Sequence, residues 1–182
     1  MLPTNGAVFC SYADGWKCEP EYEFGNEEKA KIYQAIEKAL AQAGLEKSGT
    51  LYGERIEDRG QQITFSALGS EAPLEEKERW DPDYAKRLKL KAIIEKDLPD
   101  FAVHIGGTTS LDITRKGIDK AYGIRRISEK LGLKFEEILY VADDMEKGSN
   151  NATIEGLGVA CRQVDNPAEA AKLISDIIGQ VD

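Results

Sequence analysis

One lysine and two adjacent carboxylates stand at positions where an α/β protein can bind ligands. Lys120 follows Asp119 at the predicted start of an amphipathic helix. Asp143 and Asp144 end a short apolar run, residues 138–142, of the kind that forms a buried strand. Because ligands bind where the strands of an open α/β sheet end, these side chains together predict a site for phosphate and Mg²⁺.

The same residue types also occur in purely structural settings. Acids after a strand often cap a helix or a turn, and this is the interpretation favoured for Asp144. His104, the only histidine, lies in a predicted strand and is expected to be structural. Asp14 sits in Ala-Asp-Gly at a predicted hairpin tip and is expected to be a turn residue, not a nucleophile.

Composition narrows the function classes. With 182 residues the chain is one domain or two small ones. A net charge of −9 disfavours nucleic acid as a partner, so an anionic substrate must be received by local cations or by a metal. No apolar run approaches a membrane span and no export signal is visible, so we expect a cytoplasmic protein without a membrane partner.

The cysteines fit the same compartment. Cys10, Cys18 and Cys161 show no metal-ligand spacing and are expected to be reduced thiols. A disulfide between Cys10 and Cys18 is the alternative, disfavoured by the odd number of cysteines and the missing export signal.

The middle of the chain predicts an α+β unit with the element order αββαββ. The expected elements are a helix over residues 27–43, strands over 51–57 and 62–68, a helix from Asp81-Pro82 to about Lys96, and a hairpin over 101–113. The second helix is expected to bury Ala85, Leu88 and Ala92 and to keep its Lys and Arg side chains in water. The unit is then a four-stranded antiparallel sheet with two helices on one face and a polar, open second face.

The hairpin register can be predicted from burial. A three-residue loop, Gly106–Thr108, pairs Ile105 with Thr109 and gathers the apolar side chains on one face. The opposite face then carries Ala102, His104, Ser110 and Asp112.

The two ends of the chain predict a different pattern of secondary structure. Residues 1–26 predict a hairpin around Asp14-Gly15, and residues after Thr114 predict βα units typical of a parallel sheet. We therefore expect an α/β protein with a partial Rossmann-like core, made of a hairpin piece (1–26) and a C-terminal piece (114–182), and an inserted α+β cap domain (27–113).

Three segments are specific enough to indicate a family. ERIEDRGQQITFSALGSEAPLEEKERWDPDYAKR, IGGTTSLDITRKGIDKAYGI and YVADDMEKGSNNATIEGLGV resemble the haloacid-dehalogenase (HAD) superfamily. More narrowly, they resemble its branch with an α/β cap, which contains eukaryotic phosphomannomutases and bacterial sugar phosphatases. LPTNGAVFCSYADGW is similar to the core hairpin of the same branch.

The resemblance implies roles for individual residues. Lys120 matches the lysine that neutralises the transferred phosphate, and Asp143 matches the carboxylate that binds Mg²⁺. Asn151 stands where the family has a second, metal-supporting acid. Cap positions that hold the substrate are matched by Arg59, Lys77, Ser110 and Asp112.

The resemblance also shows departures. The family's nucleophile loop (DxDGT-like) and its following Ser/Thr motif are absent, as though roughly two strand–helix units were missing before Leu2. Ser70 replaces a phosphate-binding arginine of the cap, and Ala142 replaces the glycine before the metal-binding aspartate.

Two functions of different class therefore compete. The first is Mg²⁺-dependent phosphoryl transfer on a phosphorylated sugar, with this chain alone expected to be inactive because it lacks the attacking aspartate. The second is a non-catalytic sugar-phosphate-binding or dimerisation module, since the resemblance implies a homodimer through the cap. A receiver-type signalling domain fits poorly, because its acids come early in the chain and its lysine late.

Overall fold

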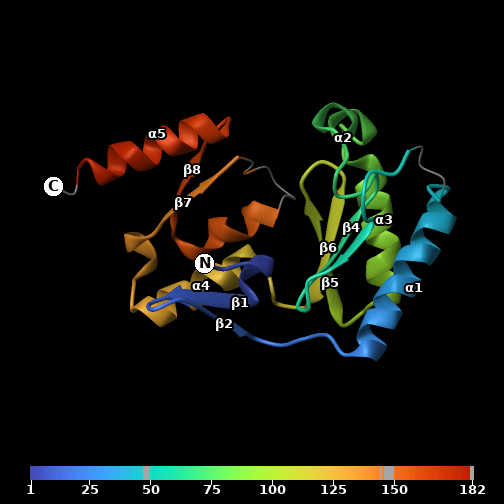
Figure 1. Ribbon diagram of the computed structural model, residues 1–182, viewed down its shortest axis with the longest axis horizontal. Helices are drawn as coiled ribbons and strands as arrows, with labels where there is room; N and C mark the ends of the chain where they lie inside the picture. The colour runs from blue at the N-terminus through green and yellow to red at the C-terminus, as the bar shows by residue number, and fades with distance from the viewer. Residues whose placement is uncertain (47–49, 144, 146–149, 181–182) are drawn as a thin grey trace.

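The computed structural model describes residues 1–46, 50–143, 145 and 150–180. Figure 1 shows two groups of elements side by side. We call one the sheet module; it contains α1 (Asn26–Ala43), β3 (Ile56–Asp58), β4 (Ile63–Ser66), α2 (Leu74–Trp80), α3 (Ala85–Asp97), β5 (Phe101–Gly106) and β6 (Ser110–Arg115). We call the other the βα module; it contains η1 (Thr4–Gly6), β1 (Val8–Tyr12), β2 (Trp16–Pro20), α4 (Lys120–Leu131), η2 (Phe135–Glu137), β7 (Leu139–Ala142), η3 (Asn150–Leu157), β8 (Ala160–Gln163) and α5 (Pro167–Ile178).

The sheet module confirms the predicted αββαββ order. Its strands pair antiparallel in the order β3-β4-β6-β5, and α1 and α3 cover one face (Figure 1). The first strand is shorter than predicted because Tyr52 bonds across to Leu68 and Glu71 instead of extending the ladder. The short helix α2 was not predicted.

The β5–β6 hairpin has the predicted loop length and faces but another register. Ile105 pairs with Leu111, not with Thr109, and the loop is residues 107–109. Thr109 leaves the hairpin ladder because its carbonyl accepts a bond from the backbone N–H of Ala67. A shift of two residues keeps each side chain on its face, so Asp112 still lies on the polar side.

The predicted buried face of the second helix is wrong. Leu88 is 52% exposed, while Leu90 and Ile94 enter the core. The helix begins only at Ala85 because the Asp81 side chain reaches forward and accepts from backbone N–H groups of the first turn.

The expectation that the basic side chains of this helix stay in water is wrong at Arg87. Its side chain is 3% exposed, and Nε donates to Asp81 Oδ2 at 2.7 Å. Burial alone would raise the pKa of Asp81, but hydrogen bonds from Arg87 and Lys86 lower it overall. The guanidinium also donates to the Gly107 carbonyl and lies over the Tyr84 ring.

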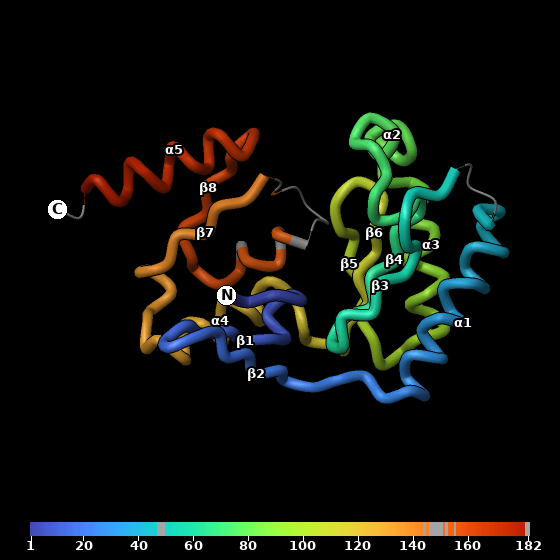
Figure 2. The backbone as a smooth tube through the Cα atoms, in the orientation of Figure 1, coloured from blue at the N-terminus to red at the C-terminus, as the bar shows by residue number. Residues whose placement is uncertain are grey.

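The polar face of the sheet is not open as predicted. Thr64 and Ser66 are each 5% exposed, and Thr114 is fully buried. The βα module lies on this side of the sheet (Figure 2), and Asn5 of its η1 turn bonds to Gln62 at the start of β4.

The βα module is built on a parallel strand pair, as predicted for this part of the chain. β7 and β8 run parallel, and α4 packs against η1 and η3. Gly6 of η1 lies so close to α4 that an added Cβ would sit 2.4 Å from Gly123 Cα. Within the described residues no helix is long and apolar enough to span a membrane.

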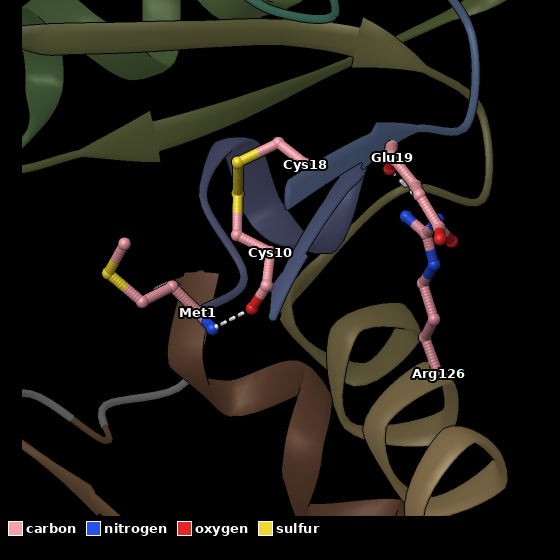
Figure 3. The surroundings of a disulfide bond; sticks show 5 residues. All are labelled: Met1, Cys10, Cys18, Glu19 and Arg126. Carbon is pink, nitrogen blue, oxygen red and sulfur yellow. Dashed lines mark hydrogen bonds between the residues drawn. A yellow bond between two sulfur atoms is a disulfide. The ribbon is translucent and has the colours of Figure 1, made fainter. Parts of the chain in front are cut away.

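The prediction of three reduced cysteines is wrong. Cys10 and Cys18 form a disulfide across the β1–β2 hairpin (Figure 3). The hairpin register places these residues directly opposite each other, with Cα atoms 4.1 Å apart, so their sulfurs can bond. Arg126 of α4 donates to the carbonyls of Gly6 and Glu19 and holds the hairpin on the helix. Cys161 is a free, exposed thiol.

The two connections between the modules are tied together. Arg115, at the end of β6, makes a bidentate contact with Glu28 of α1 and lies over the Tyr22 ring, 4.5 Å from its centre. Its backbone N–H also donates to the Tyr22 hydroxyl at 3.1 Å. We call these three residues the clasp; they join the incoming and the outgoing chain at one place.

Candidate functional site

A cavity of about 680 Å³ is lined by residues of both modules. Its size falls in the range of small-molecule sites. Five of the residues predicted from the sequence line it, namely Arg59, Asp112, Lys120, Asp143 and Asn151. Lys120 and Asp143 are 23 positions apart by number and reach the same cavity from α4 and from the end of β7.

Lys120 is the first residue of α4. Asp119 caps the helix by accepting from the Tyr122 backbone N–H at 2.7 Å. The capped end presents the positive pole of the helix dipole, and Lys120 adds a full charge at the same point. This end of the cavity is therefore suited to an anion.

Asp143 and Asn151 both offer side-chain oxygen atoms to the cavity. Asp143 directly follows β7 and is exposed, and the Asn151 side-chain oxygen accepts from the Tyr140 hydroxyl at 2.6 Å. Burial and the Asp143 charge both raise the pKa of Tyr140, so its hydroxyl keeps its proton. Asp144, predicted to cap a turn, lies outside the described residues.

This donor set fits Mg²⁺ better than a softer metal. Mg²⁺ accepts one or two carboxylates and fills its other positions with water and phosphate oxygens. Among residues 1–46, 50–143, 145 and 150–180 there is no cluster of three or more His, Cys, Asp or Glu side chains that could enclose a metal.

Arg59 reaches the cavity from the β3–β4 turn. The turn is shaped by Asp58, which accepts from the Gly60 N–H at 2.9 Å. The Arg59 guanidinium is 46% exposed and lies 3.3 Å from Glu57, a surface contact of small energy. Arg59 can therefore exchange this contact for an anionic ligand.

Asp112 lies on the polar face of β6. Its Oδ1 accepts from the Thr64 hydroxyl at 2.8 Å, and its Oδ2 lies beside Gly106, where an added Cβ would be only 3.1 Å away. Burial raises the pKa of Asp112, although Thr64 and the positive charges of Arg59 and Lys120 oppose the shift. A buried carboxylate in a cavity is a strong hydrogen-bond acceptor.

Three other predicted positions lie outside the cavity lining. Ser110 is 3.2 Å from Ser66 Oγ on the polar face, and Lys77 donates to the Ser70 carbonyl at 3.0 Å. His104 Nε2 lies 3.1 Å from the Ile118 carbonyl, and burial together with Lys91 lowers its pKa. His104 thus bonds to the backbone outside the cavity lining.

Sequence reasoning missed several polar side chains of the lining, among them Asn5, Gln62 and Tyr84. None of these three residues was a predicted site residue. Nothing local distinguishes Asn5, because its position depends on the contact between Gly6 and Gly123. Gln62 could have been found from its place one residue before the buried strand β4.

Comparison with known sequences gives a consistent result. The profile of the family described as eukaryotic phosphomannomutase matches residues 17–180. A phosphomannomutase of Triticum aestivum is 30% identical over 107 residues, which cover 56% of this chain and 41% of the relative. The chain spans about half the length of the curated relatives it matches.

Solved structures share the fold. The IMP-nucleotidase of Plasmodium falciparum superposes with a TM-score of 0.61 at 15% identity, over 96% of this chain and 46% of the other. A haloacid dehalogenase-like hydrolase from Bacteroides thetaiotaomicron superposes with a TM-score of 0.52 at 15% identity, over 95% and 74%. The predicted HAD-type α/β fold with a cap-like antiparallel sheet is thereby confirmed.

Proposed function

Because this chain belongs to the eukaryotic phosphomannomutase family, we propose that its cavity is the cation- and phosphate-binding half of a phosphoryl-transfer site for phosphorylated sugars. The supporting observation is that Lys120 and Asp143, from different elements, line one cavity together with Arg59 and Asp112. An anion-binding end and a metal-binding carboxylate in one cavity are what phosphoryl transfer requires.

Each residue has a role that follows from its chemistry. Lys120, at the positive end of α4, neutralises the phosphate. Asp143 and Asn151 hold Mg²⁺, which when bound supplies positive charge to the phosphoryl oxygens. Asp143 would supply the charged ligand of the cation, and the neutral Asn151 oxygen would support it without adding charge.

The sheet module supplies recognition of the ligand. Arg59 contacts an anionic group through its exposed guanidinium, and Asp112 accepts hydrogen bonds from sugar hydroxyls. Ser110 and Lys77, which match further cap positions of the family, lie outside the cavity lining and act only if the ligand extends toward them. The sheet module (27–113) is then the cap, and residues 1–26 and 114–182 are the core.

A non-catalytic sugar-phosphate-binding module is the second candidate. It is favoured by one observation: among the described residues that line the cavity, the only carboxylates are Asp112 and Asp143. Both have other roles above, so no nucleophile is left among them. Asp14 lies at the tip of the β1–β2 hairpin and does not line the cavity. Dimerisation through the cap and a cytoplasmic location complete the proposal.

Binding is tested by calorimetry with mannose 1-phosphate, with and without Mg²⁺. We expect Lys120→Ala to weaken binding about tenfold or more, because it removes a charge-assisted contact. Lys116→Ala, an exposed lysine four residues earlier, is the matched control. Asp143→Asn should abolish the Mg²⁺ dependence and Asp165→Asn should not. Equal affinity in Lys120→Ala and in the unaltered chain would refute the site.

Turnover separates the two candidates. We expect no phosphoryl transfer by this chain alone, measured both as phosphate release and as isomerisation of mannose 1-phosphate. We expect transfer after the nucleophile-bearing segment of a curated phosphomannomutase is joined to its N-terminus. Binding without either reaction in the joined protein would favour the non-catalytic module. Release by the chain alone that survives Asp14→Asn and is lost in Lys120→Ala would reveal a nucleophile that we have not identified.

A further inference from the structure

Four polar side chains form a continuous chain of hydrogen bonds from one module to the other. Asn5 Nδ2 donates to Gln62 Oε1 at 3.0 Å, and Gln62 Nε2 donates to Thr64 Oγ1 at 2.9 Å. Thr64 Oγ1 in turn donates to Asp112 Oδ1 at 2.8 Å. The chain begins on the η1 turn of the βα module and ends on β6 of the sheet module.

The carboxylate at one end determines the direction of every bond. An ionised Asp112 can only accept, so the Thr64 hydroxyl must donate to it. The Thr64 oxygen is then left as an acceptor, which directs the NH₂ group of Gln62 toward it. The Gln62 oxygen consequently faces Asn5, which must donate.

Asn5, the first residue of this hydrogen-bond chain, lies in a segment of unusual backbone geometry. Thr4 and Asn5 have φ values of 53° and 55°, a conformation that is strained for a β-branched residue such as Thr4. The strain is maintained because Gly6 packs directly on Gly123 of α4. The middle of the chain is shielded from water, since Gln62 is 3% exposed.

We propose that Asn5, Gln62 and Thr64 act as a polarised relay that positions Asp112 as an acceptor for a ligand hydroxyl and links this state to the contact between the two modules. Asn5, Gln62 and Thr64 are thus positioning residues. The ligand named here, a sugar hydroxyl, rests on the proposed function; the relay itself rests on the contacts above.

The relay acts on a carboxylate surrounded by few charges. Arg59 of the β3–β4 turn, His104 of β5 and Lys120 of α4 are the titratable groups that act on Asp112, and all three favour its ionised form, as does the Thr64 bond. Burial opposes them. Loss of the Thr64 donor should therefore raise the pKa of Asp112.

The test is a double-mutant cycle read out by NMR titration of the Asp112 carboxyl carbon. In Asn5→Asp the new carboxylate cannot donate, so the Gln62 amide turns its NH₂ group toward it and presents its oxygen to Thr64. The Thr64 hydroxyl then donates to Gln62 and leaves Asp112. We expect the pKa of Asp112 to rise by about one unit.

A second variant background separates the direct electrostatic effect of the new carboxylate on the pKa of Asp112 from the effect that passes through the relay. In Gln62→Leu the relay is cut, and Asn5→Asp should shift the pKa of Asp112 by only about 0.3 units. The same loss of coupling is expected in Thr64→Val, a background that serves if Gln62→Leu does not fold. Ser66→Ala, on the same face but outside the relay, should change neither shift. Equal shifts with and without Gln62 would overturn the relay.

Ligand binding tests separately whether Asp112 accepts a hydrogen bond from a ligand hydroxyl. Thr64→Val should weaken binding of mannose 1-phosphate about fivefold and leave binding of inorganic phosphate unchanged, because only the sugar phosphate carries hydroxyls beyond its phosphate group that can reach Asp112. An equal loss for both ligands would overturn the assignment of Asp112 to a hydroxyl. If the unaltered chain binds neither ligand, the proposed function and the assignment of Asp112 to a sugar hydroxyl both fail. The double-mutant cycle on the pKa of Asp112 still decides whether the relay exists.

Discussion

The two modules use apolar side chains in opposite ways. The sheet module encloses one continuous core of Ile, Leu, Val, Phe and Ala side chains contributed by α1, α3 and the sheet. In the βα module buried apolar side chains are few and scattered, while large ones remain exposed. Among the described residues these are Met1, Tyr12, Trp16, Leu131, Leu133, Leu139, Ile174, Ile177 and Ile178.

The difference shows what each module needs from its surroundings. A four-stranded sheet covered by two helices buries enough apolar area to be stable by itself. A two-stranded parallel sheet does not, because parallel strands are normally buried on both faces. The βα module therefore depends on its contacts with the sheet module, such as the bond between Asn5 and Gln62.

The largest expected effect is in the core of the sheet module. Phe65 is 1% exposed, and Phe65→Ala should lower the free energy of unfolding by about 4 kcal/mol, since it removes buried area and leaves a cavity. Leu139→Ala, at a residue 44% exposed, should cost less than about 1 kcal/mol. Denaturant unfolding measures both. Hydrogen exchange in which β7 and β8 are protected as strongly as β4 and β6 would contradict the comparison.

The second effect concerns the buried charge pair of the sheet module. Arg87→Met leaves Asp81 buried without its cation and should cost about 3 kcal/mol at neutral pH. The unaltered protein should lose stability as pH falls below about 4, because the pKa of Asp81 is lower in the folded than in the unfolded state. In Arg87→Met the backbone N–H groups of residues 86 and 87 still lower this pKa, but the charge and the side-chain hydrogen bond of Arg87 no longer offset burial, so the loss in acid should shrink. Thermal unfolding between pH 3 and 7 measures it.

A smaller effect is expected from the disulfide, the one covalent cross-link recorded in the described part of the βα module. Reduction of Cys10–Cys18 should cost about 2 kcal/mol, because the bond closes a short loop in the unfolded chain. The loss should be confined to the βα module, so exchange protection of β4 and β6 should not change. Cys161→Ser, with an exposed free thiol removed, is the control. An equal loss of protection in both modules would show that they unfold together.

The smallest effect is a gain in stability at the cavity. Since burial raises the pKa of Asp112 above 3.8, the folded state binds the proton more tightly, and stability falls as pH rises through this window. Asp112→Asn should therefore raise the free energy of unfolding by about 1 kcal/mol at pH 7 and by little below pH 4. Sugar-phosphate binding should weaken in the same variant. Asp100→Asn, an exposed acid, should leave both quantities unchanged.

Most of the fold was predictable because its signals are local. The element order, the faces of β5 and β6 and the capped start of α4 follow from alternation and from Asp119. The start of α3 was not predictable, since Asp81 caps the helix from outside it. The burial of Arg87 was not predictable either, because it depends on its pairing with Asp81, which hydrophobic periodicity does not show. The Cys10–Cys18 bond depends on a hairpin register centred on Asp14; a two-residue Asp14-Gly15 turn would instead have paired Cys10 with Glu19.

The site was predictable only in part. Lys120, Asp143, Arg59 and Asp112 stand at element ends or on a polar face, and these positions can be recognised in a sequence. Asn5 and Gln62 could not be paired, because their contact joins segments far apart in the chain through the packing of Gly6 on α4.

The clasp has a consequence for how the molecule can be taken apart. Tyr22 and Arg115 bring the two points where the chain crosses between modules into contact, so the segment between them starts and ends at one spot. Such a segment behaves as a cassette: it can be excised, or its ends sealed and new ends opened elsewhere, without threading the chain through the fold.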